Sequence, residues 1–180
     1  MKKMTWVTGL LAGFALLSLA AETQADNTRW IEGQIGIDGE HGFRITLPEG
    51  WQFDSIPPIH PCFSFTSGSD PNLRGSISAS KRLDNKTARQ ELDEWLATAQ
   101  DLMIPGESYE ASPVGETRLG GEEAVICAEM FEDERGVVAS LNVFAVKGEN
   151  SYHLLISSLA DQYDALKADS QFIQTNLRFQ

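Results

Sequence analysis

Four strand-like stretches follow one another in the second half of the chain, separated only by short turns. They cover residues 107–118, 122–132, 136–147 and 151–159. The breaks between them are rich in Gly, Asp, Glu and Asn, which favour tight turns. Connections this short can join only antiparallel neighbours, so the pattern predicts an antiparallel meander. The stretch 137–146 is apolar on both alternating faces, which predicts a central strand covered on each side.

Two further stretches have the periodicity of helices. Residues 87–103 carry a continuous apolar stripe at helical spacing, with Trp95 in the middle, so we expect Trp95 to be a core residue. Thr87 and Gln90 have the spacing of a capping box at the start of this helix. Residues 161–176 predict a second helix that begins at an aspartate. Two helices that cover an antiparallel meander give an α+β fold.

The N-terminal residues have the three parts of a secretory signal. Lys2 and Lys3 precede an uncharged apolar run, and small residues up to Ala25 provide a cleavage site. The run is shorter than the roughly 20 residues of a membrane-spanning helix, and no cysteine near the cut could carry a lipid. We therefore expect a signal peptide over 1–25 and no stable membrane anchor. The protein should reside in the periplasm or, alternatively, be secreted.

The rest of the chain has the length of one domain. Residues 26–40 are a polar lead-in with room for one short strand around 31–37. The single α+β domain is expected over 41–180, beginning with an alternating strand at 43–47.

Residues 42–51, with the sequence GFRITLPEGW, resemble the opening strand of the PsbP-like superfamily. The order of elements is similar too: strands, a long helix, a meander, then a terminal helix that ends in Leu177-Arg178-Phe179. The resemblance extends over roughly residues 40–180. It implies an α/β/α sandwich that serves as a scaffold for binding partners. Members of this superfamily have no common set of catalytic residues, so the resemblance assigns no site residue.

The chain has two cysteines, Cys62 and Cys127. Two cysteines in a small exported domain usually pair, so we expect a disulfide, with two free thiols as the alternative. On the chain-entropy model this bridge would contribute about 4 kcal/mol. His60 lies two residues from Cys62, but one histidine beside one cysteine is a weak metal signal. We expect no metal and no cofactor.

The charge pattern points to a binding partner rather than to catalysis. The net charge of −12 disfavours nucleic acid and anionic lipid and steers the protein toward basic partners. No motif of a serine hydrolase, a nucleotide-binding loop or a metalloprotease occurs. The segment 107–134 holds nine acidic residues and one basic residue. Alternation along strands should bring some of these acids onto one outward face.

We therefore expect a non-catalytic envelope protein that binds a basic protein partner, such as an inhibitor, a toxin-immunity protein or an accessory subunit. The residues expected to form the partner-binding acidic face are Tyr109, Glu129, Phe131, Glu132, Asp133 and Glu134. One alternative is a hydrolase that uses a pair of carboxylates. Another is a small-ligand or metal carrier with a cleft at the proline-rich loop 57–61, walled by Trp51, His60 and Phe63.

Overall fold

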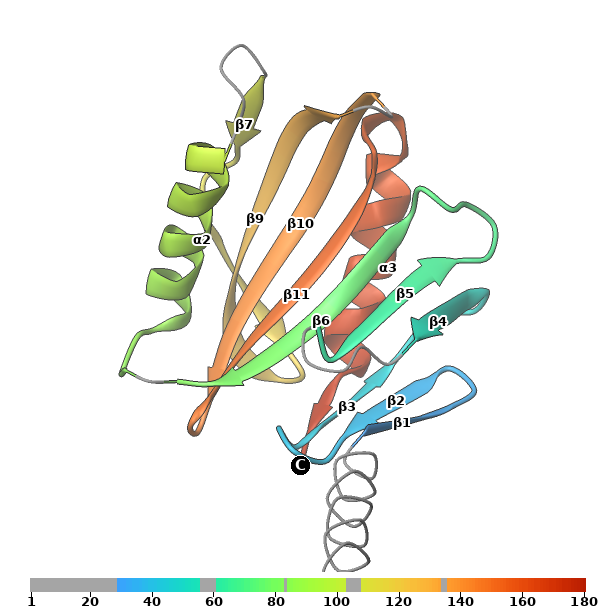
Figure 1. The fold of residues 1–180 in the computed structure, drawn as a ribbon, viewed down its shortest axis with the longest axis vertical. Helices are drawn as coiled ribbons and strands as arrows, with labels where there is room; N and C mark the ends of the chain where they lie inside the picture. Colours follow the sequence, from blue (N-terminus) through green and yellow to red (C-terminus); the bar gives the residue numbers. More distant parts are fainter. Residues whose placement is uncertain (1–28, 56–60, 83, 103–107, 134–135) are drawn as a thin grey trace, which may run out of the picture.

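A large antiparallel sheet organises the protein (Figure 1). The computed structural model describes residues 29–55, 61–82, 84–102, 108–133 and 136–180. Within them the sheet has the order β4-β5-β6-β11-β10-β9-β7, and β8 also pairs with β9. These strands are β4 (Trp51–Ser55), β5 (Phe63–Ser67), β6 (Arg74–Lys81), β7 (Tyr109–Ala111), β8 (Gly115–Leu119), β9 (Glu122–Asp133), β10 (Gly136–Lys147) and β11 (Asn150–Leu159). The expected signal peptide lies outside the described residues.

The predicted antiparallel meander is confirmed. β10 pairs along most of its length with β9 on one side and β11 on the other, antiparallel to both. The first predicted stretch differs: it forms two short strands, β7 and β8, which both pair with β9. Pro113 lies between them and has no N–H group to contribute to a sheet. β6 closes the other side of the meander by pairing with β11.

A second, smaller sheet lies beside the large one. It has the order β1-β2-β3-β12, built from β1 (Arg29–Glu32), β2 (Ile35–Asp38), β3 (Phe43–Thr46) and β12 (Arg178–Phe179). β3 is the alternating strand predicted from the sequence. One short strand is predicted before it, but the structure has a hairpin that turns at Gly33, where φ is 59°. The segment expected as a polar lead-in therefore contains both strands of this hairpin.

The large sheet has a helix on each face (Figure 1). α2 (Ala88–Leu102) packs against β9 and β10, and α3 (Tyr163–Asn176) follows the 3-10 turn η1 (Ala160–Gln162) and packs on the other side. The predicted capping box is present: the Thr87 amide donates to Gln90 Oε1 at 2.9 Å, and the Gln90 amide donates to Thr87 Oγ1 at 3.3 Å. In the described part of the chain, no helix is long and apolar enough to cross a membrane.

The alternating side chains of β10 enter two separate apolar clusters. Ala139, Leu141 and Val143 belong to the main core, on the α3 side. Phe144 packs with Leu92 of α2 and Cys127 of β9 in a smaller cluster on the opposite face. The prediction of a central strand covered on both sides is confirmed, and α3 covers the larger of the two clusters.

Trp95 is not the core residue that the apolar stripe predicts. Its side chain is 36% exposed, whereas Leu92, one turn earlier, is fully buried. The reason lies under the helix: the C-terminal half of α2 stands away from the sheet, and a cavity separates them. Trp95 forms part of the wall of this cavity instead of filling the core.

Candidate functional site

The cavity under α2 has a volume of about 400 Å³ and opens between the helix and the sheet. Among the described residues, its walls combine apolar and aromatic side chains with the hydroxyls of Thr98, Ser140 and Ser157 and with two charged side chains. The apolar walls come from Trp95 and Ala99 of α2, Tyr109 of β7, Phe131 of β9 and Leu155 of β11. The charged residues are Glu129 of β9 and Arg74 of β6. The volume and the apolar character are those of a ligand or side-chain binding site.

Glu129 provides a buried carboxylate in this cavity. Its side chain is 3% exposed and accepts three hydrogen bonds from neutral groups. Tyr109 Oη–H donates to Oε1 at 2.5 Å, Trp95 Nε1–H donates to Oε2 at 3.2 Å, and the Asn142 amide also donates to Oε2. No lysine or arginine of the described residues forms an ion pair with it. The carboxylate therefore lies out of water with no ion-pair partner among these residues.

The network continues from Glu129 to His153. Because the Asn142 amide nitrogen points at Glu129, its oxygen faces His153 and can only accept a hydrogen bond, so His153 Nε2–H is the donor at 2.9 Å. Burial lowers the pKa of His153 to about 4, which keeps the ring neutral at neutral pH. The ring stacks on Phe144 and meets the edge of Trp95. Burial and the Glu129 carboxylate raise the pKa of Tyr109 well above its usual range, so it remains a proton donor.

Glu129 does not join an exposed acidic face, contrary to the sequence prediction. In β9, Glu129 and Phe131 point toward α2, while Glu132 has the opposite parity and is exposed. Asp133 is half-buried at the end of the strand, and Glu134 lies outside the described residues. Of the predicted partner-binding set, the structure brings together Tyr109, Glu129 and Phe131, and it does so as parts of the cavity.

The predicted disulfide is wrong. Cys62 and Cys127 are both free and both buried, and they belong to the two different apolar clusters. Cys62 lies at the start of β5 and Cys127 lies in β9, with β6, β11 and β10 between them. Four strand spacings amount to about 19 Å, whereas a disulfide requires Cα atoms within about 7 Å. An oxidising compartment favours cysteine pairing in general, but the sequence does not give the distance between Cys62 and Cys127.

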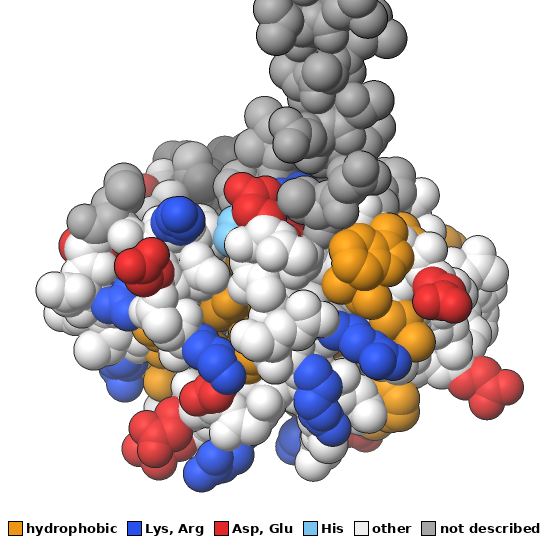
Figure 2. Space-filling model, turned by 90° about the horizontal axis from the view of Figure 1, so that it is seen from below, with side chains coloured by type: hydrophobic (Ala, Val, Ile, Leu, Met, Phe, Trp, Pro, Cys, Tyr) orange, Lys and Arg blue, Asp and Glu red, His pale blue; other side chains and the backbone are white. Residues whose placement is uncertain are grey.

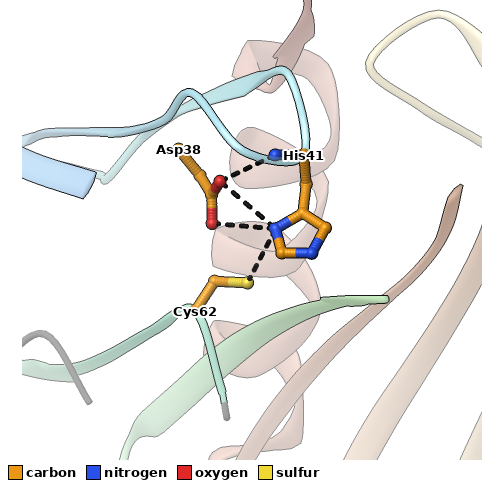
Figure 3. Close-up of side chains that lie close together, drawn as sticks. All are labelled: Asp38, His41 and Cys62. Atoms are coloured by element: carbon orange, nitrogen blue, oxygen red, sulfur yellow. Dashed lines mark hydrogen bonds and ion pairs between the residues drawn. The ribbon is translucent and has the colours of Figure 1, made fainter. Parts of the chain in front are cut away.

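A second polar cluster, on the other side of the molecule, contains Cys62 (Figure 3). His41 Nδ1 lies 3.2 Å from each carboxylate oxygen of Asp38 and 3.9 Å from Cys62 Sγ. Asp38 and His41 come from the end of β2 and the turn that follows, and the His41 amide donates to Asp38 Oδ1 at 2.9 Å. Sequence reasoning considered only His60 beside Cys62, and His60 lies outside the described residues. Only the packing of the small sheet on the large one brings these three residues together.

This cluster has the residue types of a cysteine nucleophile with its base, but not the geometry. In such a relay the two ring nitrogens of the histidine face different partners, whereas here Nδ1 faces both the carboxylate and the thiol. Burial, together with the nearby Asp38 carboxylate, raises the pKa of Cys62 to about 12. The thiol therefore holds its proton at neutral pH and is not an activated nucleophile.

A cleft of about 780 Å³ at the N-terminus of α2 carries basic residues. Lys86 pairs with Asp84 and Glu94, and Arg89 pairs with Asp93, so much of this charge is neutralised locally. Figure 2 shows acidic and basic side chains interspersed at this end of the molecule. The net negative charge is therefore not a uniform acidic surface.

No family model and no curated protein sequence matches this chain. Solved structures do match. Cyanobacterial PsbP (CyanoP) from Synechocystis has a TM-score of 0.63 and 16% identity, with 84% of this chain and 95% of that chain covered. LpqN, involved in cell envelope biogenesis of Mycobacterium tuberculosis, has a TM-score of 0.58 and 18% identity, covering 88% and 95%. A Pseudomonas aeruginosa protein of unknown function has a TM-score of 0.51 and 16% identity, covering 82% and 94%.

At these identities the likeness concerns the fold and not the site residues. Two helices pack against a large antiparallel sheet in the same arrangement over most of the chain. The resemblance seen in residues 42–51 is thereby confirmed at the level of structure, and the protein has a PsbP-like α+β fold.

Proposed function

We propose that this protein is a non-catalytic binding protein of the cell envelope, and that the cavity under α2 receives a lysine or arginine side chain of a protein partner. The observation that carries the proposal is the buried, unpaired carboxylate of Glu129 among aromatic walls. It accepts one hydrogen bond at Oε1 and two at Oε2, so Oε1 retains a free lone pair.

A basic side chain fits this cavity chemically at both of its ends. A buried carboxylate without a cation is costly, and an incoming ammonium or guanidinium group offsets that cost. The apolar stem of lysine or arginine packs well on aromatic rings, and the cationic head is attracted to their faces. The rings of Trp95, Tyr109 and Phe131 provide such walls. The net charge of −12 steers basic partners toward the protein at longer range.

The same observations disfavour the hydrolase alternative. A glycosidase mechanism requires two carboxyl groups that face each other, and Glu129 is the one carboxylate among the described residues that line this cavity. His153 Nε2 is committed to Asn142, and both cysteine thiols have raised pKa values because they are buried. Location in the envelope rests on the expected signal peptide, and the similarity to LpqN is consistent with it.

The proposal can be tested with blocked tripeptides that differ at one position. Acetyl-Gly-Lys-Gly-amide and its Gln counterpart would be titrated into the isotopically labelled protein, with the Trp95 indole N–H resonance as the NMR readout. Only the Lys peptide should shift this resonance in a saturable way. Glu129→Gln should weaken its binding at least about tenfold, because a buried charge partner is lost. Arg74→Gln should strengthen binding about two- to fivefold, because a cation at the cavity wall is removed.

The opposite responses of the two variants identify the sign of the ligand charge. If both responses are reversed, the site takes an anion and the proposal is wrong. Equal shifts with the Lys and Gln peptides would also contradict it. If hexylammonium binds and no Lys peptide does, the cavity belongs to a small-ligand carrier and the protein-partner assignment fails.

A further inference from the structure

We propose that Asp38, His41 and Cys62 form a binding site for a divalent transition metal of the zinc type. Their ligand atoms, one oxygen, one nitrogen and one sulfur, all lie within 4.8 Å of one another. Carboxylate, imidazole and thiolate are the three ligand types that zinc takes in proteins. This site is distinct from the α2 cavity and its assignment does not depend on the proposed function.

The distances match a tetrahedral ion with little adjustment. Zinc–ligand bonds of the usual lengths at tetrahedral angles separate nitrogen and oxygen ligands by about 3.4 Å, and nitrogen and sulfur ligands by about 3.6 Å. The structure has 3.2 Å between His41 Nδ1 and the Asp38 oxygens, and 3.9 Å between Nδ1 and Cys62 Sγ. A small rotation of the Cys62 side chain closes the remaining gap. One nitrogen, His41 Nδ1, faces both Asp38 and Cys62. This arrangement excludes a catalytic relay, but it is what a metal ion shared by the three residues requires.

The surrounding contacts hold the ligands in place. Arg29 Nε donates to Asp38 Oδ2 at 2.9 Å, and the His41 amide donates to Oδ1, which fixes the carboxylate and leaves each oxygen a further lone pair. Tyr152 Oη–H donates to the His41 carbonyl at 2.6 Å. The Cys62 amide donates to the Ile77 carbonyl at 2.8 Å. Such outer contacts orient ligands before the ion arrives.

Binding of the ion changes the charge of this buried cluster. Asp38 and Cys62 are fully buried and His41 is 8% exposed, so an unbalanced charge here would be costly. On binding, metal–sulfur and metal–nitrogen bonds form, the thiol proton of Cys62 passes to solvent, and the His41 ring exchanges its proton from Nδ1 to Nε2 through solvent, with no change in oxidation state. Carboxylate and thiolate then contribute two negative charges against the two positive charges of the ion, and the Arg29 guanidinium, which already pairs with Asp38, also lies 3.6 Å from the carboxylate of Glu40. In the described part of the chain three ligands converge, which leaves one tetrahedral position for water or an outside ligand.

The test uses Zn²⁺ for affinity and Co²⁺ as a spectroscopic probe, added to reduced, metal-free protein. Wild type should bind one ion and show thiolate-to-Co²⁺ charge-transfer absorption. Cys62→Ser should abolish this absorption and weaken Zn²⁺ binding by more than the about 10- to 100-fold that loss of an outer contact causes. Cys127→Ser is the matched control, because Cys127 is also buried but lies on the other face of the sheet, so it should retain both properties.

A measurement on the unmutated protein covers the case in which Cys62→Ser does not fold. Zn²⁺ should shift the His41 Nδ1 resonance in the ¹⁵N spectrum and leave the His153 resonances unchanged. The proposal is overturned if Co²⁺ gives no thiolate band in wild type, if Cys62→Ser keeps the band, or if Zn²⁺ leaves His41 Nδ1 unmoved.

Discussion

The indole nitrogen of Trp95 and the carboxylate of Glu129 are hydrogen-bonded at 3.2 Å, across 34 residues of sequence. This contact joins the part of α2 that stands away from the sheet to the centre of β9. Below it, Leu92 secures the helix by apolar packing with Phe144 and Cys127. Helix α2 is therefore held by an apolar contact near its start and by a polar contact beside the cavity.

Trp95→Phe removes the polar contact and keeps an aromatic ring at this position. The phenyl ring is smaller than the indole, and Glu129 loses one of its three donors. Hydrogen bonds to charged groups contribute about 1.5–3 kcal/mol, so the free energy of unfolding should fall by an amount in that range. Urea denaturation measures it. A loss below about 0.5 kcal/mol would mean that water replaces the indole donor at no cost.

Stability should fall between neutral pH and pH 5 because of His153. Its pKa is about 4 in the folded protein and about 6.5 when unfolded, so only the unfolded chain takes up the proton in this window. The folded state thus loses stability as the pH falls below about 6.5, and the full loss, reached near pH 4, is about 3 kcal/mol. Denaturation at several pH values from 7 to 5 avoids most carboxylate titration. His153→Phe should make the free energy of unfolding nearly independent of pH over this range. An unchanged slope in that variant would mean that another group causes the pH dependence.

Both thiols should be titratable. Protein unfolded without reductant should react with two equivalents of a thiol reagent, and adding reductant should leave its denaturation midpoint unchanged, because no disulfide constrains the unfolded chain. In the native state the reaction should be slow, since both side chains are buried. Fewer than two reactive thiols per unfolded chain would contradict the structure.

Gly75 should tolerate no side chain. A Cβ there would lie 2.5 Å from Phe65 Cε2 and 2.8 Å from the Leu155 carbonyl oxygen, in a tightly packed region between strands. Gly75→Ala should lower the free energy of unfolding by about 1–3 kcal/mol or more. Gly115→Ala is the control, because its nearest contact would be an ordinary 3.5 Å from Ile126. Equal effects in the two variants would show that crowding is not the cause.

The fold could be predicted from the sequence where the signal is local. The meander, helix α2 and its capping box could be predicted because hydrophobic periodicity and turn residues act within a few positions of the chain. The β1–β2 hairpin was harder to detect, because each strand has only four residues and Gly33 interrupts a segment that reads as one strand.

The candidate sites could be predicted only in part. The sequence places Tyr109, Glu129 and Phe131 together with Glu132, Asp133 and Glu134 on one outward face. Strand alternation alone does not reveal that neutral donors surround the Glu129 carboxylate on the inner face. Three hydrogen bonds to Glu129 come from residues as distant as Trp95 and Asn142, and these contacts make its burial tolerable. Asp38, His41 and Cys62 lie together because the two sheets pack on each other, and the spacing of these residues in the sequence does not predict that packing.

The pairing of β12 with β3 determines when the small sheet can be completed. Phe179 lies opposite Phe43, and the Gln180 amide donates to the Gly42 carbonyl at 2.8 Å. β3 therefore has both its edges paired only after β12 has been synthesised. While synthesis is under way, β3 has an open edge, and the contacts that complete it span more than 130 residues. Such long-range closure slows folding. A nascent chain of this kind cannot complete the small sheet until residues 178–180 have been synthesised.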